Sequence, residues 1–525
     1  MRKIYYNGDF LTLENENPEA IVIENDKILK LGTEKDLINL KDEDAEVIDL
    51  QGKTMMPAFI DSHSHFFAVA DNLMQASLND CTNFKQIQDT LLKYKNDNSV
   101  EAGKWIFANG YDHNNLEEGQ HISKKEIDDI LPNNPVVIKH QSGHSGVLNS
   151  MGLEKLGITK DTPSPEGGKI EIENGELTGY LEENAFIYYL KKIPMPTIDE
   201  LLEGVIRAQE EYASYGITTA QEGYMTKELV AIYKEIMKRN ELFLDIVAFI
   251  EPEILDLVEN DFEENIKKYK NNLKIGGIKI FLDGSPQSRT AWMRTPYIDD
   301  ENYFGYGTMN DIDVQKVVKE AYNNNLQILA HCNGDRAAEQ YINSLQSIGE
   351  EINKIRPVLI HGQLLGVDQL EMVKKLGVIP SFFVAHTYYW GDVHIKNFGK
   401  VRASKISPAG SSKAKDILFT FHQDAPVIKP NMFETIWCAV NRITKSGEIL
   451  GNDEKIDVLD AIKAVTINAA YQYFEENKKG SIKEGKLADL IILDKNPLKV
   501  DKQDLRNVKV LENIKNGNTI WRRLI

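Results

Sequence analysis

Short runs of β-forming residues alternate with turn signals at both ends of the chain. The first 55 residues include KIYYNGDFLTL and AIVIENDKILKLG, in which Asn-Gly and Asn-Asp pairs interrupt apolar and β-branched positions. The C-terminal segments GKLADLIILD and NVKVLENIKNGNTI repeat this pattern. We therefore predict that residues 1–56 and 479–525 together form one small, discontinuous domain, a β-sandwich built from both termini.

In the middle of the chain, apolar runs of strand length alternate with longer segments of helical periodicity. This alternation is typical of parallel strands joined by crossover helices. Eight is the number of strands that closes a (β/α)₈ barrel, whereas a doubly wound sheet more often stops at about five or six. The predicted fold class is therefore α/β, with a TIM-type barrel over residues 57–478. The eight predicted strands are Met55–His65, Ile217–Gly223, Leu242–Glu251, Gly276–Asp283, Gln327–Asn333, Pro357–Gln363, Val378–Thr387 and Ile417–Asp424.

A long segment separates the first predicted strand from the second. It covers about residues 68–195 and contains WIFANGYD, PVVIKHQSGH and the hairpin-like GGKIEIENGELTGY, which have strand patterns of their own. We interpret it as an inserted subdomain with some sheet, lying over the mouth of the barrel.

Composition and charge restrict the class of protein. Of the 525 residues, 61 are Lys or Arg and 80 are Asp or Glu, which gives a net charge of −19. This is the wrong sign for a phosphate-binding surface, so neither nucleic acid nor an anionic membrane is an expected partner. The N-terminal residues lack the apolar region of a signal peptide, so we expect a cytoplasmic protein, and a homodimer on general frequency alone. Three scattered cysteines, Cys81, Cys332 and Cys438, are expected to be reduced and buried.

Histidines and one aspartate fall at the C-terminal ends of the predicted strands, where barrel active sites are assembled. His63 and His65 are two apart, which puts both imidazoles on one face of a strand. His331, His361 and Asp424 end the fifth, sixth and eighth predicted strands. Singly, each has another interpretation, such as a hydrogen-bonded core histidine or a turn-forming aspartate. As a set they predict a metal site.

Lys279 lies inside the fourth predicted strand, in the apolar run GGIKIFLDG, where a lysine is costly unless it is paired or chemically changed. It could reach solvent or pair with Asp283. Alternatively, a lysine that has lost its proton can add carbon dioxide and become a carbamate, whose two oxygens could each hold one metal ion. Imidazoles with a carboxylate suit Zn²⁺ or a similar divalent ion, with Mn, Fe or Co also possible.

Such a site predicts hydrolysis of an amide or a related bond. Water between the metal ions would have a lowered pKa, and Asp424 could take its proton and return it to the leaving group.

Seven segments carry a resemblance to a known family: MMPAFIDSHSHF, GIKIFLDGSPQSRTAW, LAHCNGD, IHGQ, GVIPSFFVAHTYYWGD, FHQDAPV and GKLADLIILD. The chain resembles the metal-dependent amidohydrolase superfamily, and within it the branch of N-substituted formamide deformylase and exoenzyme regulatory protein-like amidohydrolases. The resemblance implies a (β/α)₈ barrel, a composite β-domain and one or two divalent metal ions. Carried over to this sequence, it implies that one ion is held by His63, His65 and Asp424 and the other by His331 and His361, with carboxylated Lys279 as the bridge.

Candidates for contact with a small-molecule substrate come from the strand ends and the insertion. His140 and His144 lie in a Ser-Gly loop, and the resemblance favours His144 as a contact to the substrate carbonyl over a structural role. His386, expected at the end of the seventh strand, could line the pocket or be a hydrogen-bonding core residue. Trp390 could form an apolar wall. Arg289 could bind a carboxylate or form a surface ion pair.

A second group of possible ligands, Asp112, His113 and His121, lies among acidic residues and is predicted to be an exposed loop. The leading hypothesis is a hydrolase of a linear amide, an N-acyl or N-formyl amine. A deaminase, a lactonase or a cyclic-imide hydrolase would use the same site. A non-catalytic regulatory scaffold is a third alternative, which the intact ligand set disfavours.

Overall fold

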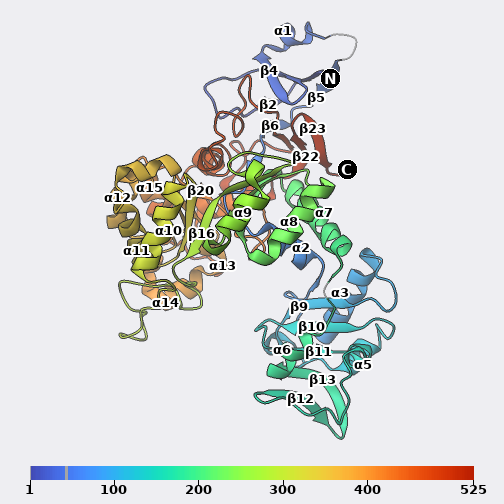
Figure 1. Cartoon of the computed structure of the whole chain (residues 1–525). Helices are drawn as coiled ribbons and strands as arrows, with labels where there is room; N and C mark the ends of the chain where they lie inside the picture. Colours follow the sequence, from blue (N-terminus) through green and yellow to red (C-terminus); the bar gives the residue numbers. More distant parts are fainter. Residues whose placement is uncertain (1, 42–44, 195, 525) are drawn as a thin grey trace. The chain divides into compact units, whose positions relative to one another are not determined.

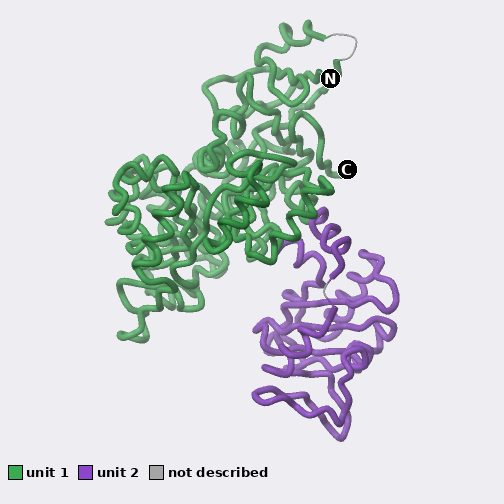
Figure 2. The backbone as a smooth tube through the Cα atoms, viewed as in Figure 1, with its two compact units in different colours: residues 1–67, 208–525 green, residues 68–207 purple. Residues whose placement is uncertain are grey.

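The computed structural model describes residues 2–41, 45–194 and 196–524. The chain divides into two compact units, one of residues 1–67 with 208–525 and the other of residues 68–207 (Figure 2). Among the described residues, no helix has the length and apolar character needed to cross a membrane. The three cysteines are free and buried, as expected.

An eight-stranded sheet forms the core of the first unit, and every pairing between its neighbouring strands is parallel. At its two edges, the Ser62 hydroxyl donates to the carbonyl of Phe421 (2.9 Å), and the His65 N–H donates to Ala425 (2.8 Å). The curled parallel sheet fits a TIM-type barrel. Its strands, some labelled in Figure 1, are β7 (Phe59–Ile60), β14 (Ile217–Met225), β15 (Asp245–Ile250), β16 (Leu273–Phe281), β17 (Gln327–Cys332), β18 (Val358–His361), β19 (Ile379–Phe382) and β20 (Thr420–Phe421).

Helices connect these strands, and two of them, α10 (Asp311–Asn323) and α16 (Met432–Asn441), begin with a side-chain N-cap from an asparagine. In α10, the N-cap side chain of Asn310 accepts a hydrogen bond from the N–H of Asp313 (3.0 Å), and a stripe of buried residues that includes Val314 and Val318 faces the core. The other barrel-unit helices are α7 (Ile198–Ser214), which starts in the second unit, α8 (Lys227–Arg239), α9 (Leu255–Asp261), α11 (Asp335–Gln346), α12 (Leu370–Lys375), α13 (His386–Tyr389), α14 (Gly391–Ala403), α15 (Ala409–Ala414), α16 (Met432–Asn441), α17 (Val458–Ala464) and α18 (Ile467–Gln472).

All eight predicted strands overlap an observed one, but two predictions were partly wrong. The run Met55–His65 contains two strands, β6 (Thr54–Pro57) of a different sheet and then β7. The seventh strand was predicted to reach Thr387, yet β19 ends at Phe382 and the next residues turn into α13. A short apolar run has the same hydrophobic pattern in a buried strand as in a buried helix, so periodicity did not separate them.

Two smaller sheets contain the strands of the two ends of the chain, and only the second of them combines strands from both ends. One has the order β4-β3-β1-β5, and the other, β2-β6-β21-β22-β23, pairs N-terminal with C-terminal strands. Their apolar side chains share one buried cluster, in which Tyr5 and Ile21 of the first sheet join Met55 and Leu490 of the second. The bounds are β1 (Arg2–Tyr6), β2 (Asp9–Phe10), β3 (Ala20–Glu24), β4 (Lys27–Gly32), α1 (Glu34–Ile38), β5 (Glu46–Asp49), β21 (Leu490–Leu493), β22 (Val510–Lys515) and β23 (Asn518–Arg522).

The second unit has a six-stranded mixed sheet of its own, in the order β12-β13-β11-β10-β9-β8. Buried apolar clusters pack against it, with Ile87, Leu91 and Ile138 in one and Leu181 and Phe186 in another. Its elements are α2 (Phe66–Leu73), which begins in the first unit, β8 (Ala76–Ser77), α3 (Phe84–Asp97), β9 (Ile106–Tyr111), α4 (Lys124–Asp128), β10 (Val136–His140), β11 (Ser145–Leu148), α5 (Ser150–Lys155), β12 (Gly168–Glu173), β13 (Glu176–Glu183) and α6 (Asn184–Leu190).

Candidate active site

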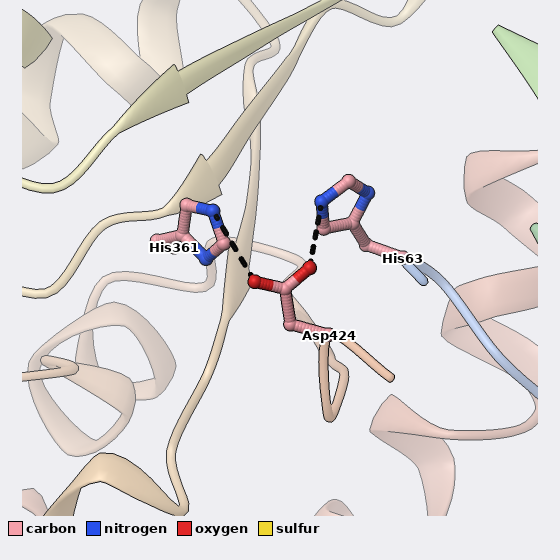
Figure 3. A group of neighbouring side chains, drawn as sticks. All are labelled: His63, His361 and Asp424. Atoms are coloured by element: carbon pink, nitrogen blue, oxygen red, sulfur yellow. Dashed lines mark ion pairs between the residues drawn. The ribbon is translucent and has the colours of Figure 1, made fainter. Parts of the chain in front are cut away.

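The six predicted metal ligands lie in the barrel unit, within or just after the C-terminal halves of its strands. Parallel strands of a barrel present these ends at one face, so residues far apart in sequence converge there. Side-chain ligand atoms of His63, His361 and Asp424 all lie within 4.8 Å of one another (Figure 3). His63 and His65 follow β7, Lys279 lies in β16, His331 in β17, His361 ends β18, and Asp424 follows β20.

Asp424 is at the centre of the group. Its Oδ1 lies 3.4 Å from Nε2 of His63 and 3.4 Å from Nε2 of His65. This oxygen is buried and accepts no hydrogen bond from any described residue. Burial alone would raise the pKa of the Asp424 carboxyl, but the imidazoles of His65, His361 and His63 hold it well below its usual value. An ionised, under-coordinated oxygen among imidazoles is what a cation site requires.

A second pair of imidazoles lies on the other side of Asp424. Nδ1 of His331 is 2.9 Å from Nε2 of His361, and the same His361 nitrogen is 4.0 Å from Oδ2 of Asp424. Burial lowers the pKa of both imidazoles, that of His331 to about 4, so both are neutral near pH 7. His361 and Asp424 have φ angles of 73° and 55°, and such left-handed non-glycine residues are concentrated at functional sites.

Lys279 is fully buried, and its Nζ lies 3.4 Å from Nε2 of His63. Burial lowers the pKa of its amine to about 7, with partial compensation from Asp424. Asp283, the alternative partner suggested by the sequence, does not pair with it. The Asp283 carboxylate instead accepts hydrogen bonds from the backbone N–H groups of Trp292, Asn333 and Gly334. Lys279 is therefore a buried amine that can be neutral at physiological pH.

Outer residues hold the imidazoles in orientations that suit metal binding. Oε1 of Gln221 lies 2.6 Å from Nδ1 of His63, which leaves Nε2 of that ring to face Asp424. The carbonyl of Gly284 lies 3.3 Å from Nε2 of His331, which leaves Nδ1 to face His361. Such partners fix ring orientation and tautomer in metal sites. The donor set and the unpaired Asp424 oxygen together fit one or two divalent ions.

Two residues of the site were missed at the level of sequence. His422 is fully buried, with Nε2 3.2 Å from Nδ1 of His361 and Nδ1 2.9 Å from Oγ of Ser381. Its spacing of two from Asp424 could have identified it, because residues two apart share a strand face. Asp61 has the same spacing from His63, accepts that residue's backbone N–H (3.3 Å), and has its carboxyl pKa raised to about 7 by burial.

His386 is buried, but it lies at the start of α13 and not at the end of a strand as predicted. The chain turns after β19, with the N–H of His386 donating to the carbonyl of Phe383 (3.1 Å). Nδ1 of His386 is 3.0 Å from Nε2 of His394, and its ring centroid is 4.5 Å from that of Trp390 and 4.7 Å from that of Phe383. Phe383 also contacts His422, with 5.5 Å between ring centroids, so these aromatic rings adjoin the imidazoles of the site.

Arg289 follows β16 in a loop and has a φ angle of 60°. Its guanidinium lies 5.1 Å from the ring centroid of Tyr297. Nε of Arg289 is buried and donates no hydrogen bond to a described residue. The side chain therefore keeps an unused donor, and its contact with a substrate carboxylate stays a prediction.

His144 lies in the second unit, between β10 and β11. It is 64% exposed, and its Nδ1 is 3.1 Å from Oε2 of Glu183. Its contact with substrate also stays a prediction. The expectation of an exposed loop at Asp112, His113 and His121 was wrong, because all three residues are half-buried, and Asp112 and His113 directly follow β9. The segment WIFANGYD was predicted to have a strand pattern, but Asp112 and His113 were not recognised as lying at the end of that strand.

Comparisons with known proteins agree with this geometry. Residues 46–521 match the model described as the amidohydrolase family. The chain is similar to the putative amidohydrolase YtcJ of Bacillus subtilis, with 26% identity over 100% of both chains. It is 24% identical to the N-substituted formamide deformylase of Arthrobacter pascens, over 97% of this chain and 96% of that one. A crystal structure of an uncharacterised metal-dependent hydrolase from Pyrococcus horikoshii superposes with a TM-score of 0.77 at 25% identity, over 96% of this chain and 99% of the other.

Proposed function

The chain belongs to the amidohydrolase family, and from this premise we propose that it hydrolyses a linear amide, an N-acyl or N-formyl amine, with Asp424 as the catalytic acid and base. As a member of the family it is a hydrolase of carbon–nitrogen bonds other than peptide bonds. The observation that carries the proposal is the position of Asp424, whose Oδ1 is buried, ionised and 3.4 Å from two imidazoles.

The residues at the site fit a divalent metal centre. His63, His65 and Asp424 would hold one ion, and His331 and His361 a second, with Zn²⁺ as the ion that imidazole and carboxylate ligands suit best. A bound ion of this kind supplies Lewis acidity, which polarises a carbonyl group and lowers the pKa of water. Neutral imidazoles are the form that binds metal, and burial keeps His331 and His361 in that form.

Asp424 has the charge and the position for proton transfer. Ionised, its carboxylate takes a proton from the attacking water and then gives that proton to the leaving amine nitrogen. Because the neighbouring imidazoles hold the Asp424 pKa well below its usual value, the carboxylate is ready to accept a proton across the neutral range. Nε2 of His63 and Nε2 of His65 each lie 3.4 Å from Oδ1 of this carboxylate.

Lys279 would supply the bridge between two ions as a carbamate. The neutral amine attacks carbon dioxide, a new N–C bond forms, and one proton leaves to solvent, so that the product carries a single negative charge. Burial lowers the Lys279 pKa to about 7, which makes the neutral amine available at physiological pH.

Two features support a linear amide over other carbonyl substrates. The similarity to a protein named N-substituted formamide deformylase extends over nearly the whole chain. In addition, His386, Phe383 and Trp390 form an aromatic wall beside the imidazoles, which suits an apolar amine or acyl group.

The first experiment is a metal count followed by a substrate panel. Protein purified without a His-tag or chelators is analysed for Zn, Mn, Fe, Co and Ni by inductively coupled plasma mass spectrometry, and we expect at least about two ions per chain. The metal-loaded protein is then assayed with N-formyl and N-acyl amines for release of the free amine. Release of ammonia from aminated heterocycles, or opening of lactones or cyclic imides, without amide hydrolysis would contradict the proposal.

A further inference from the structure

A second cluster of histidines lies in the other unit of the molecule. Asp112 follows β9, His113 begins a short 3₁₀ helix (His113–Asn115), and His140 ends β10. Strands β9 and β10 are parallel neighbours, so their C-terminal ends bring these side chains together. Among the described residues, two clusters bring three possible ligands close enough for one ion. One is His63, His361 and Asp424 of the barrel, and the other is Asp112, His113 and His140.

A β-bulge brings His140 to this position. Lys139 pairs with Asn109, but His140 pairs with Tyr111, so Gly110 is an extra residue in β9. Gly110 has a φ angle of 89°, and a Cβ at this position would lie 2.1 Å from the side chain of Asn79. The backbone conformation therefore favours glycine here, and a larger residue would also have to displace the Asn79 side chain.

The distances between the potential ligand atoms match those around a tetrahedral metal ion. Nδ1 of His113 is 3.3 Å from Nε2 of His140. Oδ1 of Asp112 is 3.5 Å from the same His140 nitrogen and 3.7 Å from the same His113 nitrogen. Tetrahedral zinc with bonds of about 2.0–2.2 Å separates its ligand atoms by about 3.4 Å. Three ligand atoms thus already form one face of such a tetrahedron.

Neighbouring groups hold the three side chains in place. Oδ1 of Asp112 accepts hydrogen bonds from the backbone and the side-chain amide of Asn114, both 2.9 Å. Nδ1 of His140 lies 2.9 Å from Oγ of Ser142. If this oxygen accepts a hydrogen bond from a protonated Nδ1, Nε2 of His140 keeps a lone pair that can bind metal. His121 packs against His113 with the two rings tilted by 34° and 4.0 Å between their centroids.

The three side chains are partly accessible to solvent. The exposed fraction of the side chain is 24% for Asp112, 30% for His113 and 12% for His140. An ion held here would have three protein ligands and a fourth position open to water or a small ligand. We propose that Asp112, His113 and His140 form a mononuclear site for a divalent transition ion of the zinc class, separate from the metal centre of the barrel.

A chain without an ion at this site would have a different hydrogen-bonding arrangement. Nδ1 of His140 would accept the backbone N–H of Ser142 (3.1 Å), and Nε2 would carry the proton toward His113 or Asp112. The two arrangements differ in the tautomer of His140 and in metal content, so metal titration separates them.

The test counts metal ions in the full-length chain. Chelator-treated protein is titrated with Zn²⁺ by calorimetry and with Co²⁺ by visible absorption, and the number of sites is compared with that of His113→Asn, His140→Gln and Asp112→Asn. We expect one ion per chain fewer in both histidine variants. In Asp112→Asn, which can keep the hydrogen bonds to Asn114, we expect Kd to rise at least about tenfold.

The matched control is His144→Gln, which removes an exposed histidine of the next loop that pairs with Glu183. It should keep every site. Equal site numbers in the wild type and in all variants would overturn the proposal, as would an equal loss in His144→Gln.

A second measurement uses only the wild-type chain, so it tests the proposal even if the variants fail to fold. Diethyl pyrocarbonate modification is followed by mass spectrometry with and without Zn²⁺. The ion should lower modification of His113 and His140 several-fold and leave His144 unchanged. Unchanged modification of His113 and His140 would count against an ion at this site.

Discussion

The two ends of the barrel both bury a lysine, but the two lysines have opposite electrostatics. At the C-terminal end, Lys279 has no carboxylate partner within ion-pair distance among the described residues, and burial lowers its pKa to about 7. At the N-terminal end, Lys479 lies 2.7 Å from Oδ2 of Asp245 and 2.9 Å from Oε2 of Glu475. These carboxylates outweigh the effect of burial and raise the Lys479 pKa well above its usual value.

Both lysines are buried, so the opposite directions of their pKa shifts come from the presence or absence of carboxylate partners. We call the N-terminal network balanced because each of its charged groups has a partner of opposite charge: Lys515 also pairs with Asp245 (2.9 Å), and Lys274 also pairs with Glu475. The C-terminal group leaves an oxygen of Asp424 without a hydrogen bond and an amine without a counter-ion. A balanced network has a structural role, whereas an unbalanced one is open to a metal ion or to covalent change.

The largest expected effect is at the unbalanced end. Asp424→Asn removes both the proton acceptor and a metal ligand while keeping the shape of the side chain. We expect kcat/KM for amide hydrolysis to fall at least about 10³-fold. Steady-state kinetics on the best substrate of the panel measures the effect, and circular dichroism checks that the fold is intact. A variant with wild-type turnover would remove Asp424 from the chemistry.

A substitution in the balanced network at the N-terminal end of the barrel should lower the stability of the protein without changing its metal content. Asp245→Asn leaves Lys479 and Lys515 with an uncompensated buried charge, and we expect it to lower the free energy of unfolding by about 3–5 kcal/mol. Urea denaturation followed by tryptophan fluorescence gives the change, and the metal count per chain should stay at the wild-type value. If metal is lost while stability is kept, the contrast between the two ends does not hold.

Lys279 should make the metal-free protein more stable as pH rises. Its pKa is about 7 when folded, below its usual value, so the unfolded chain binds more protons above pH 7 and stability increases with pH. From pH 7 to pH 9 this contributes about 2 kcal/mol. The Lys279→Met variant has no amine at this position, so its free energy of unfolding should lack this increase with pH.

The measurement is urea denaturation of both proteins across this pH range, in buffer free of carbon dioxide and metal. The difference between wild type and Lys279→Met isolates the lysine from all other titrating groups. Parallel stability curves for the two proteins would show that Lys279 is charged in the folded state.

The smallest expected effect is at an exposed ion pair. Lys400 and Glu448 are 2.6 Å apart, but both side chains are largely exposed, 64% and 48%. Solvent and salt screen such pairs, so Lys400→Ala should change the free energy of unfolding by less than about 1 kcal/mol. A larger loss in the same urea assay would mean that Asp245→Asn reports on ion pairs in general and not on burial.

The sequence predicted the barrel strands and the convergence of their ends, because the position of a residue along an apolar run is a local property. His331 and His361 could be assigned to strand ends on that basis. The hydrogen-bond and ion-pair partners of the buried groups could not be predicted. Gln221 reaches His63 from another strand, and Lys479 reaches Asp245 across 234 positions of sequence. His422 was overlooked for a different reason: the apolar run that contains β20 has the same pattern whether its histidine supports a ligand or only fills the core, and only the spacing of two from Asp424 distinguishes it.

The pairing of β6 with β21 also has a consequence for synthesis on the ribosome. Met56 faces Ile491 in this sheet, so β6 has no partner on that side until Ile491 has been translated. At about 5–20 residues per second, that delay is roughly 20 to 90 s. During this time the apolar edge of β6 is accessible to chaperones and to other nascent chains. Emergence of β21 from the ribosome is therefore the step that allows this sheet to close over β6.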